Sequence, residues 1–66
     1  MSTIGEQIKA ARWAKGRTQE QLAKEIRVSR TAVLKWEKGI RFPRRQKRPK
    51  LESVLEVKLD WDGPDA

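Results

Sequence analysis

Residues 18–38 read TQEQLAKEIRVSRTAVLKWEK, and this stretch predicts two short helices joined by a tight turn. Thr18 and the glutamine three residues later have the capping-box spacing, in which each side chain bonds the backbone N–H of the other residue. Ser29 is a typical N-cap residue for the second helix. We therefore expect helices at Gln19–Ile26 and Arg30–Lys38.

The apolar residues of this stretch fit a helix-turn-helix arrangement, in which two helices pack against each other across a short turn. The residues expected to face inward are Leu22, Ala23, Ile26, Val28, Val33 and Trp36. Among them, Ala23 is small enough for the place where the two helices cross. The outward face of the second helix then holds Arg30, Thr31, Leu34 and Lys35.

A further helix is expected on the N-terminal side of this stretch. Thr3 and Glu6 repeat the capping-box spacing, so this helix begins at Ile4, and Gly16 can end it in the left-handed conformation. On the C-terminal side, the residues up to Arg48 show no apolar period, and we interpret them as a basic loop.

The last predicted helix begins at Pro49, because proline suits the first helical position. Its apolar stripe consists of Leu51, Val54 and Leu55, and a short final turn follows with Leu59 and Trp61. No stretch alternates long enough for a strand, so the fold class is all-α. We expect one domain over residues 1–66, with the helix-turn-helix over about 18–38, the basic loop over about 39–48 and C-terminal helices over about 49–62.

The 66 residues contain neither cysteine nor histidine. This composition excludes disulfides, thiolate and imidazole metal sites, and the cysteine or serine–histidine nucleophiles of many enzymes. We expect no cofactor and no enzymatic activity, and we interpret Glu52 and Glu56, a carboxylate pair by spacing, as part of a solvated helix face. The longest apolar run has three residues, so we expect a cytoplasmic protein without a membrane-spanning segment.

Positive charge is concentrated in residues 27–50, which hold ten basic residues and one acid, a net charge of +9. The remainder of the chain carries a net charge of −2. This clustering points to a polyanionic partner rather than to a merely solvated surface. The stretch has no large apolar face opposite its charges, which argues against a membrane-surface peptide.

The motifs resemble the lambda-repressor-like family of phage Cro and repressor DNA-binding domains. The matching stretches are IGEQIK (residues 4–9), Arg12, GRTQEQLA (16–23), VSRTAV (28–33), WEKG (36–39), Pro43 and LDW (59–61). The resemblance covers residues 4–61 and implies a compact five-helix domain whose third helix reads DNA.

The sequence departs from the family pattern in two respects. Relatives usually have glycine where this chain has Arg27, and a left-handed backbone there costs a non-glycine residue about 1 kcal/mol. We therefore expect the turn to differ in detail. The apolar positions of the family's fourth helix fall on Arg45, Arg48 and Pro49, so we expect that helix to start about six residues late, after a long basic loop.

The resemblance assigns roles to the basic residues. Arg30, Thr31 and Lys35 match positions that touch base edges, while Leu34 is either a contact to a thymine methyl group or a tolerated exposed leucine. Gln19 matches a phosphate contact, with helix capping as the alternative role. The cations expected to contact the sugar-phosphate backbone are Lys38, Arg41, Arg44, Arg45, Lys47 and Arg48.

Other family positions imply structural roles. Arg12 and Glu37 match charged residues that pair across the first and third helices. Trp13 lies off the apolar stripe and either covers the edge of the domain or touches the DNA backbone. Relatives pair through the segment after the fourth helix, which here offers Val57, Leu59 and Trp61 as a dimer interface.

The resemblance thus implies a sequence-specific, double-stranded DNA-binding transcriptional regulator. We expect a Cro-like repressor that occupies a near-palindromic operator as a homodimer and needs no small-molecule ligand. One alternative is RNA binding, for which only Phe42 and Trp13 offer aromatic rings for base stacking. The other is an antitoxin- or adaptor-type interaction module, which would not need the basic stretch.

Overall fold

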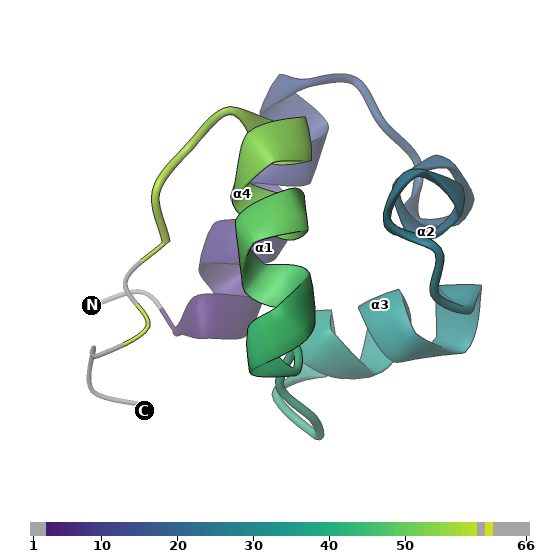
Figure 1. Cartoon of the computed structure of the whole chain (residues 1–66), viewed down its shortest axis with the longest axis vertical. Coiled ribbons are helices and arrows are strands. Elements are labelled where there is room, and N and C mark those ends of the chain that lie inside the picture. Colours follow the sequence, from purple (N-terminus) through teal and green to yellow (C-terminus); the bar gives the residue numbers. More distant parts are fainter. Residues whose placement is uncertain (1–2, 60, 62–66) are drawn as a thin grey trace.

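The structure is a computed structural model that describes residues 3–59 and 61 (Figure 1). These residues form four α-helices and one 3-10 turn, and no strand is found among them. The elements are α1 (Ile4–Ala14), α2 (Gln19–Ile26), α3 (Arg30–Lys38), η1 (Arg45–Lys47) and α4 (Arg48–Leu55). The all-α class is confirmed, and the first three helices begin at the residues that the sequence predicts.

Side-chain caps explain where the first three helices begin. The Thr3 hydroxyl accepts a hydrogen bond from the backbone N–H of Glu6 at 3.1 Å, and the Glu6 carboxylate accepts one from the backbone N–H of Thr3 at 2.9 Å. Thr18 and Gln21 make the same reciprocal pair at 3.0 and 2.8 Å. The hydroxyl of Ser29 accepts from the N–H of the third residue after it. Each cap satisfies donors that a helix start leaves unpaired.

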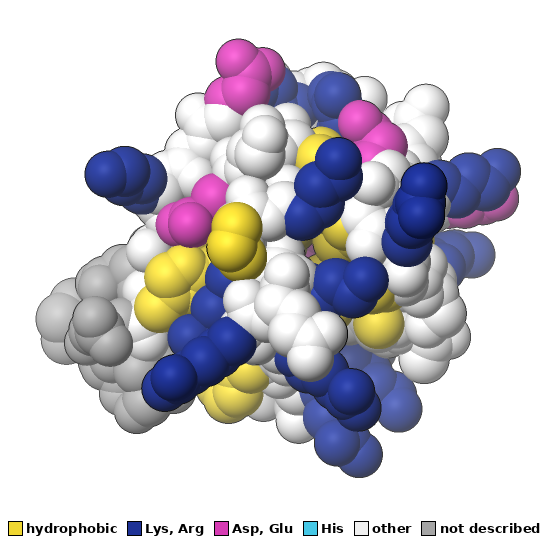
Figure 2. Space-filling model, viewed as in Figure 1, with side chains coloured by type: hydrophobic (Ala, Val, Ile, Leu, Met, Phe, Trp, Pro, Cys, Tyr) yellow, Lys and Arg dark blue, Asp and Glu magenta, His cyan; other side chains and the backbone are white. Residues whose placement is uncertain are grey.

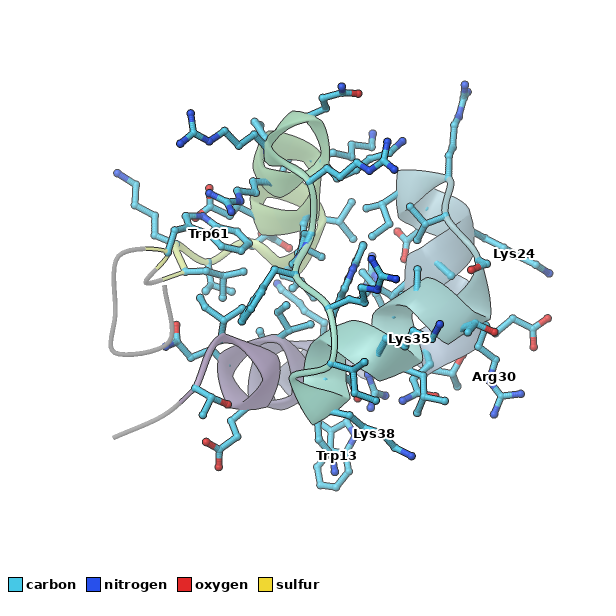
Figure 3. All side chains as sticks on the ribbon, turned by 90° about the horizontal axis from the view of Figure 1, so that it is seen from below. Trp13, Lys24, Arg30, Lys35, Lys38 and Trp61 are labelled. Carbon is cyan, nitrogen blue, oxygen red and sulfur yellow. The ribbon has the colours of Figure 1, made fainter. Side chains whose placement is uncertain are left out.

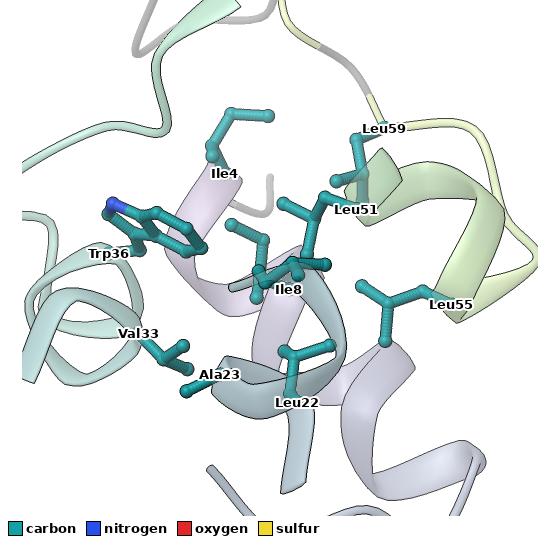
Figure 4. Close-up of a cluster of buried hydrophobic side chains, with 10 residues drawn as sticks. Ile4, Ile8, Leu22, Ala23, Val33, Trp36, Leu51, Leu55 and Leu59 are labelled. Atoms are coloured by element: carbon teal, nitrogen blue, oxygen red, sulfur yellow. The ribbon is translucent and has the colours of Figure 1, made fainter. Parts of the chain in front are cut away.

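One hydrophobic core lies between the four helices (Figure 4). Its buried members are Ile4, Ile8, Leu22, Ala23, Ile26, Val33, Trp36, Leu51, Leu55 and Leu59. Every helix contributes at least two of these side chains. The inner face of α3, with Val33 and Trp36, is therefore held by the other helices. No helix within residues 3–59 has the length and hydropathy needed to cross a membrane.

The N-terminal turn of α1 touches the C-terminal part of α3 through the backbone. Gly5 is buried, and a Cβ atom added to it would lie 2.5 Å from the carbonyl oxygen of Trp36 and 2.6 Å from that of Glu37. Atoms cannot approach that closely, so only glycine fits where these two helices meet.

The turn between α2 and α3 keeps the left-handed geometry, and our expectation that it would differ was wrong. Arg27 has φ 59° and ψ 49°, the conformation that glycine usually adopts after a helix. The N–H of Val28 donates to the carbonyl of Ala23, five residues earlier, at 2.9 Å. This is the hydrogen bond with the wider sequence span in a Schellman motif. This bond and the packing of Val28 against the core offset the backbone strain at Arg27.

The segment before α4 corrects the predicted loop. Irregular backbone is confined to residues 40–44, because η1 follows at once and α4 begins at Arg48, one residue before Pro49. Arg48 is helical despite the following proline, with φ −60° and ψ −48°. Its Nε donates to the carbonyl of Pro43 at 3.3 Å, which ties the start of α4 to the loop.

A long basic loop and a fifth helix are therefore not confirmed. The described residues after Leu55 form no helix, and residues 60 and 62, on which part of the predicted final turn falls, lie outside the described residues. Leu59 is nevertheless buried, and its N–H donates to the Glu52 carboxylate at 2.8 Å. The segment after α4 thus closes the core without helical backbone.

Replacing Arg27 with glycine tests the strain in this turn. Arg27→Gly removes the penalty of the left-handed backbone, and it also gives the unfolded chain more conformational freedom. The first effect is the larger, so we expect the free energy of unfolding to rise by about 0.5 to 1 kcal/mol. Thermal denaturation followed by circular dichroism should show a melting temperature higher by several degrees. Lys24→Gly, in the interior of the same helix, is the control and should lower stability by about 1 kcal/mol. A lower melting temperature in both variants would contradict the interpretation.

Candidate nucleic-acid interface

The outward face of α3 is basic and accessible. Arg30, Thr31, Lys35 and Lys38 are exposed, and Leu34 beside them is half-buried. Figure 3 shows the three cations spread along the helix, with Arg30 at its N-terminal end. In Figure 2 the lower part of the view, where α3 lies, carries Lys and Arg side chains, and the acidic side chains lie higher. The residues predicted to read bases thus share one surface.

The loop and η1 place further cations next to this face. Arg41, Arg44 and Arg45 are exposed, and Lys47 is half-buried. A hollow of about 460 Å³ runs between α3 and this segment, and it is lined by Thr31, Lys35, Arg41, Phe42, Arg44 and Lys47, among others. The hollow therefore brings Thr31 and Lys35, predicted to read bases, next to three of the predicted backbone-contacting cations, Arg41, Arg44 and Lys47.

Arg48 differs from the other cations of this set. Its guanidinium lies over the Trp61 ring at 4.6 Å from the ring centroid, and its Nε is bonded to the carbonyl of Pro43. The side chain is half-buried, so it stabilises the chain's own packing as well as adding positive charge.

A buried ion pair lies behind the basic face. The Nε and Nη2 of Arg12 donate to the two carboxylate oxygens of Glu37 at 2.6 and 3.1 Å, and the side chains are 9% and 4% exposed. The remaining Nη1 of Arg12 donates to the carbonyl of Arg17 at 2.9 Å. This bidentate pair joins α1 to α3 and also holds the turn that follows α1.

Gln19 belongs to the same network, which the sequence did not indicate. Its side-chain amide donates a hydrogen bond to the Glu37 carboxylate at 3.1 Å. The first residue of α2 is thereby bonded to α3. The cap of α2 is Thr18, and the capping alternative for Gln19 was therefore wrong. The resemblance pointed to Gln19 as a phosphate contact, but no sequence pattern connected it to Glu37.

Glu52 and Glu56, the carboxylate pair noted in the sequence, each have a partner within the chain. The Glu56 carboxylate forms a salt bridge with Lys15, and the hydrogen bond from the ammonium group lowers the pKa of Glu56 below its ordinary value. Glu52 accepts the backbone bond from Leu59. Glu56 thus joins the C-terminal ends of α1 and α4 and is exposed as predicted, whereas Glu52 is half-buried and holds the segment after α4. No group of three metal-ligating side chains occurs within the described part of the chain.

The residues predicted for a dimer interface lie after α4. Leu59 is 7% exposed and belongs to this chain's own core, while Val57 and Trp61 are half-buried and pack against that core. Much of their apolar surface is therefore used within one chain, and part of the surface of Val57 and Trp61 stays exposed.

A family model described as helix-turn-helix matches residues 8–61. The chain belongs to the helix-turn-helix family. The HTH-type transcriptional activator BcrR of Enterococcus faecalis is 38% identical over 57 residues, which are 86% of this chain and 28% of that protein. The chain therefore spans little more than a quarter of the length of this curated relative. The family match confirms the resemblance stated from the motifs.

Removal of the Glu37 carboxylate should destabilise the domain strongly. Glu37→Ala leaves the Arg12 guanidinium buried without a counter-ion, which typically lowers the free energy of unfolding by about 3 to 5 kcal/mol. We expect the melting temperature to fall by more than about 10 °C in thermal denaturation. The control is Glu25→Ala, which breaks the exposed pair with Arg17 and should change stability by less than about 1 kcal/mol. Equal, small shifts in both variants would contradict this role.

Proposed function

We propose that this chain is a sequence-specific transcriptional regulator that reads the major groove of duplex DNA with α3. The observation that supports this most directly is the outward face of α3, whose exposed side chains adjoin the cations of the loop through one hollow. A helix of this kind fits the major groove with its N-terminal residues at the base edges. Membership of the helix-turn-helix family supports the same function.

The chemistry of the face suits base recognition. Arg30 can donate two hydrogen bonds to O6 and N7 of guanine, and Lys35 can donate to the same acceptors. Thr31 offers a hydroxyl group or a methyl group. Leu34 is half-buried at the side of this face, and its exposed part suits a thymine methyl group.

The surrounding cations are proposed to hold the sugar-phosphate backbone. Arg41, Arg44 and Arg45 are exposed on the loop and η1, and Lys38 is exposed at the end of α3. Gln19 lies at the first position of α2, where backbone N–H groups remain available to a phosphate while its side chain bonds Glu37. Such contacts fix the register of the protein on DNA but carry no sequence information.

We further propose that two copies act together as a Cro-like repressor. One recognition helix covers only a few base pairs, which is too little for the roughly 10³- to 10⁷-fold preference over bulk DNA that regulation requires. Val57 and Trp61 offer a small exposed apolar surface for a weak dimer that forms on DNA. Occupation of a promoter represses transcription, and the relative's name shows that this family also includes an activator.

Base-reading and backbone-contacting residues should differ in binding assays. Arg30→Ala and Lys35→Ala should reduce the preference at defined base pairs by about 1 to 3 kcal/mol, because a bond to a base edge is removed. Arg44→Ala and Arg45→Ala should weaken all duplexes alike and reduce the salt slope by about one for each phosphate that is no longer neutralised. The measurement is selection from random duplexes, followed by titration at several salt concentrations. The reverse pattern would mean that the loop, rather than α3, reads sequence.

The spacing of half-sites tests the dimer. Two helices related by a twofold axis should read half-sites about 10 base pairs apart, one helical turn on the same face of DNA. Insertion of about half a turn, five base pairs, should abolish tight binding, because one half-site rotates to the opposite face. Full specificity on a single half-site in a footprint would refute the dimer.

A further inference from the structure

Trp13 is an exposed aromatic side chain that the hydrophobic core does not use. Its exposed fraction is 65%, whereas Trp36 is 5% exposed and Trp61 is half-buried beneath Arg48. Trp13 therefore does not cover the edge of the core, which was one of its two interpretations from the sequence. An indole group exposed to solvent near the end of α1 is available to bind another molecule.

Trp13 lines a hollow that reaches the base-reading end of α3. The hollow has a volume of about 820 Å³, and its lining includes Trp13, Gly16, Arg17, Thr18, Gln19 and Arg30. In Figure 3, Trp13, Lys38 and Arg30 project along one edge of the molecule. The open side of the hollow is thus continuous with the face of α3 proposed to enter the major groove.

The charges around this hollow suit an anionic ligand. The Nζ of Lys9 lies 5.2 Å from the centroid of the Trp13 ring, and Arg30 adds an exposed cation to the lining. Arg17 also lines the hollow, but its guanidinium is paired with the Glu25 carboxylate. The acid on the rim, Glu20, has Lys24 as a partner at 3.6 Å. An aromatic ring among cations offers both an apolar surface and positive potential.

We propose that Trp13 contacts the sugar-phosphate backbone of duplex DNA that flanks the bases read by α3. The DNA backbone alternates phosphate anions with apolar deoxyribose rings. The indole supplies an N–H donor for a phosphate oxygen and a flat face for a sugar, and the neighbouring cations supply the charge. This inference rests on the proposed function, because it assumes that α3 docks on duplex DNA.

The Trp13 contact has a thermodynamic property that separates it from the basic residues. It adds affinity without neutralising a phosphate, so it displaces no condensed counter-ion. It also touches no base edge, so it adds equally to specific and non-specific binding. Removal of the indole should therefore lower affinity without changing either specificity or the salt slope.

The test compares Trp13→Ala, Trp13→Phe and wild-type protein on a selected duplex and on a random duplex over a range of salt concentrations. We expect Trp13→Ala to weaken both duplexes by the same factor, at least about fivefold, with an unchanged salt slope. Trp13→Phe keeps the apolar face and should weaken binding less. Lys38→Ala is the control and should lower the salt slope. The melting temperature of Trp13→Ala should stay unchanged, since its side chain is mostly in water.

Fluorescence gives an independent measurement. In Trp61→Phe protein, Trp36 is buried and Trp13 is the exposed indole, so duplex DNA should change the emission in parallel with binding. The same titration of a variant that also carries Trp13→Phe should show no such change.

Several outcomes would overturn the inference. Equal affinities of wild type and Trp13→Ala for duplex DNA would exclude the contact while leaving the proposed function intact. Wild-type protein that binds no duplex would instead refute the proposed function. An emission change with single-stranded RNA alone would assign Trp13 to base stacking. Loss of self-association in Trp13→Ala without DNA would assign it to an interface between copies.

Discussion

The proposed DNA-binding surface depends on one buried ion pair, between Arg12 and Glu37. The carboxylate of Glu37 accepts two hydrogen bonds from Arg12 and a third from Gln19, while the remaining guanidinium nitrogen holds the carbonyl of Arg17. Three helices and a turn therefore meet at a single pair of charges. Glu37 is also the only acid in residues 27–50, and its burial keeps that negative charge away from the exposed cations of the proposed DNA-binding surface.

Local sequence rules were sufficient for the first three helices. Thr3, Thr18 and Ser29 cap them through bonds to residues three positions away, so the signal and the structure lie within one turn of chain. The apolar spacing also identified the inner face of each helix, since a period of 3.6 residues leaves one stripe for burial. The outward face of α3 is the side opposite its buried stripe. Its accessible residues could therefore be predicted from the sequence once the inner face was known.

The remaining details depend on contacts between distant residues. Arg27 adopts a backbone conformation that its own chemistry disfavours, because the Val28 bond and the core hold the turn in place. Arg48 enters a helix before a proline while its side chain is bound to Pro43 and Trp61. Gln19 meets a carboxylate 18 positions away. Local propensity carries no information about contacts between distant residues. For this reason the prediction from sequence was wrong or incomplete at all three positions.

The contact at Gly5 has a consequence for the kinetics of recognition. Backbone touches backbone between α1 and α3, so neither helix can shift without the other. The contact thus helps to fix the orientation of α3, the helix proposed to read DNA, in the free protein. On the proposed function, the association rate would then depend on diffusional encounter and on the attraction between the cationic face and the phosphates, and it would fall as ionic strength rises.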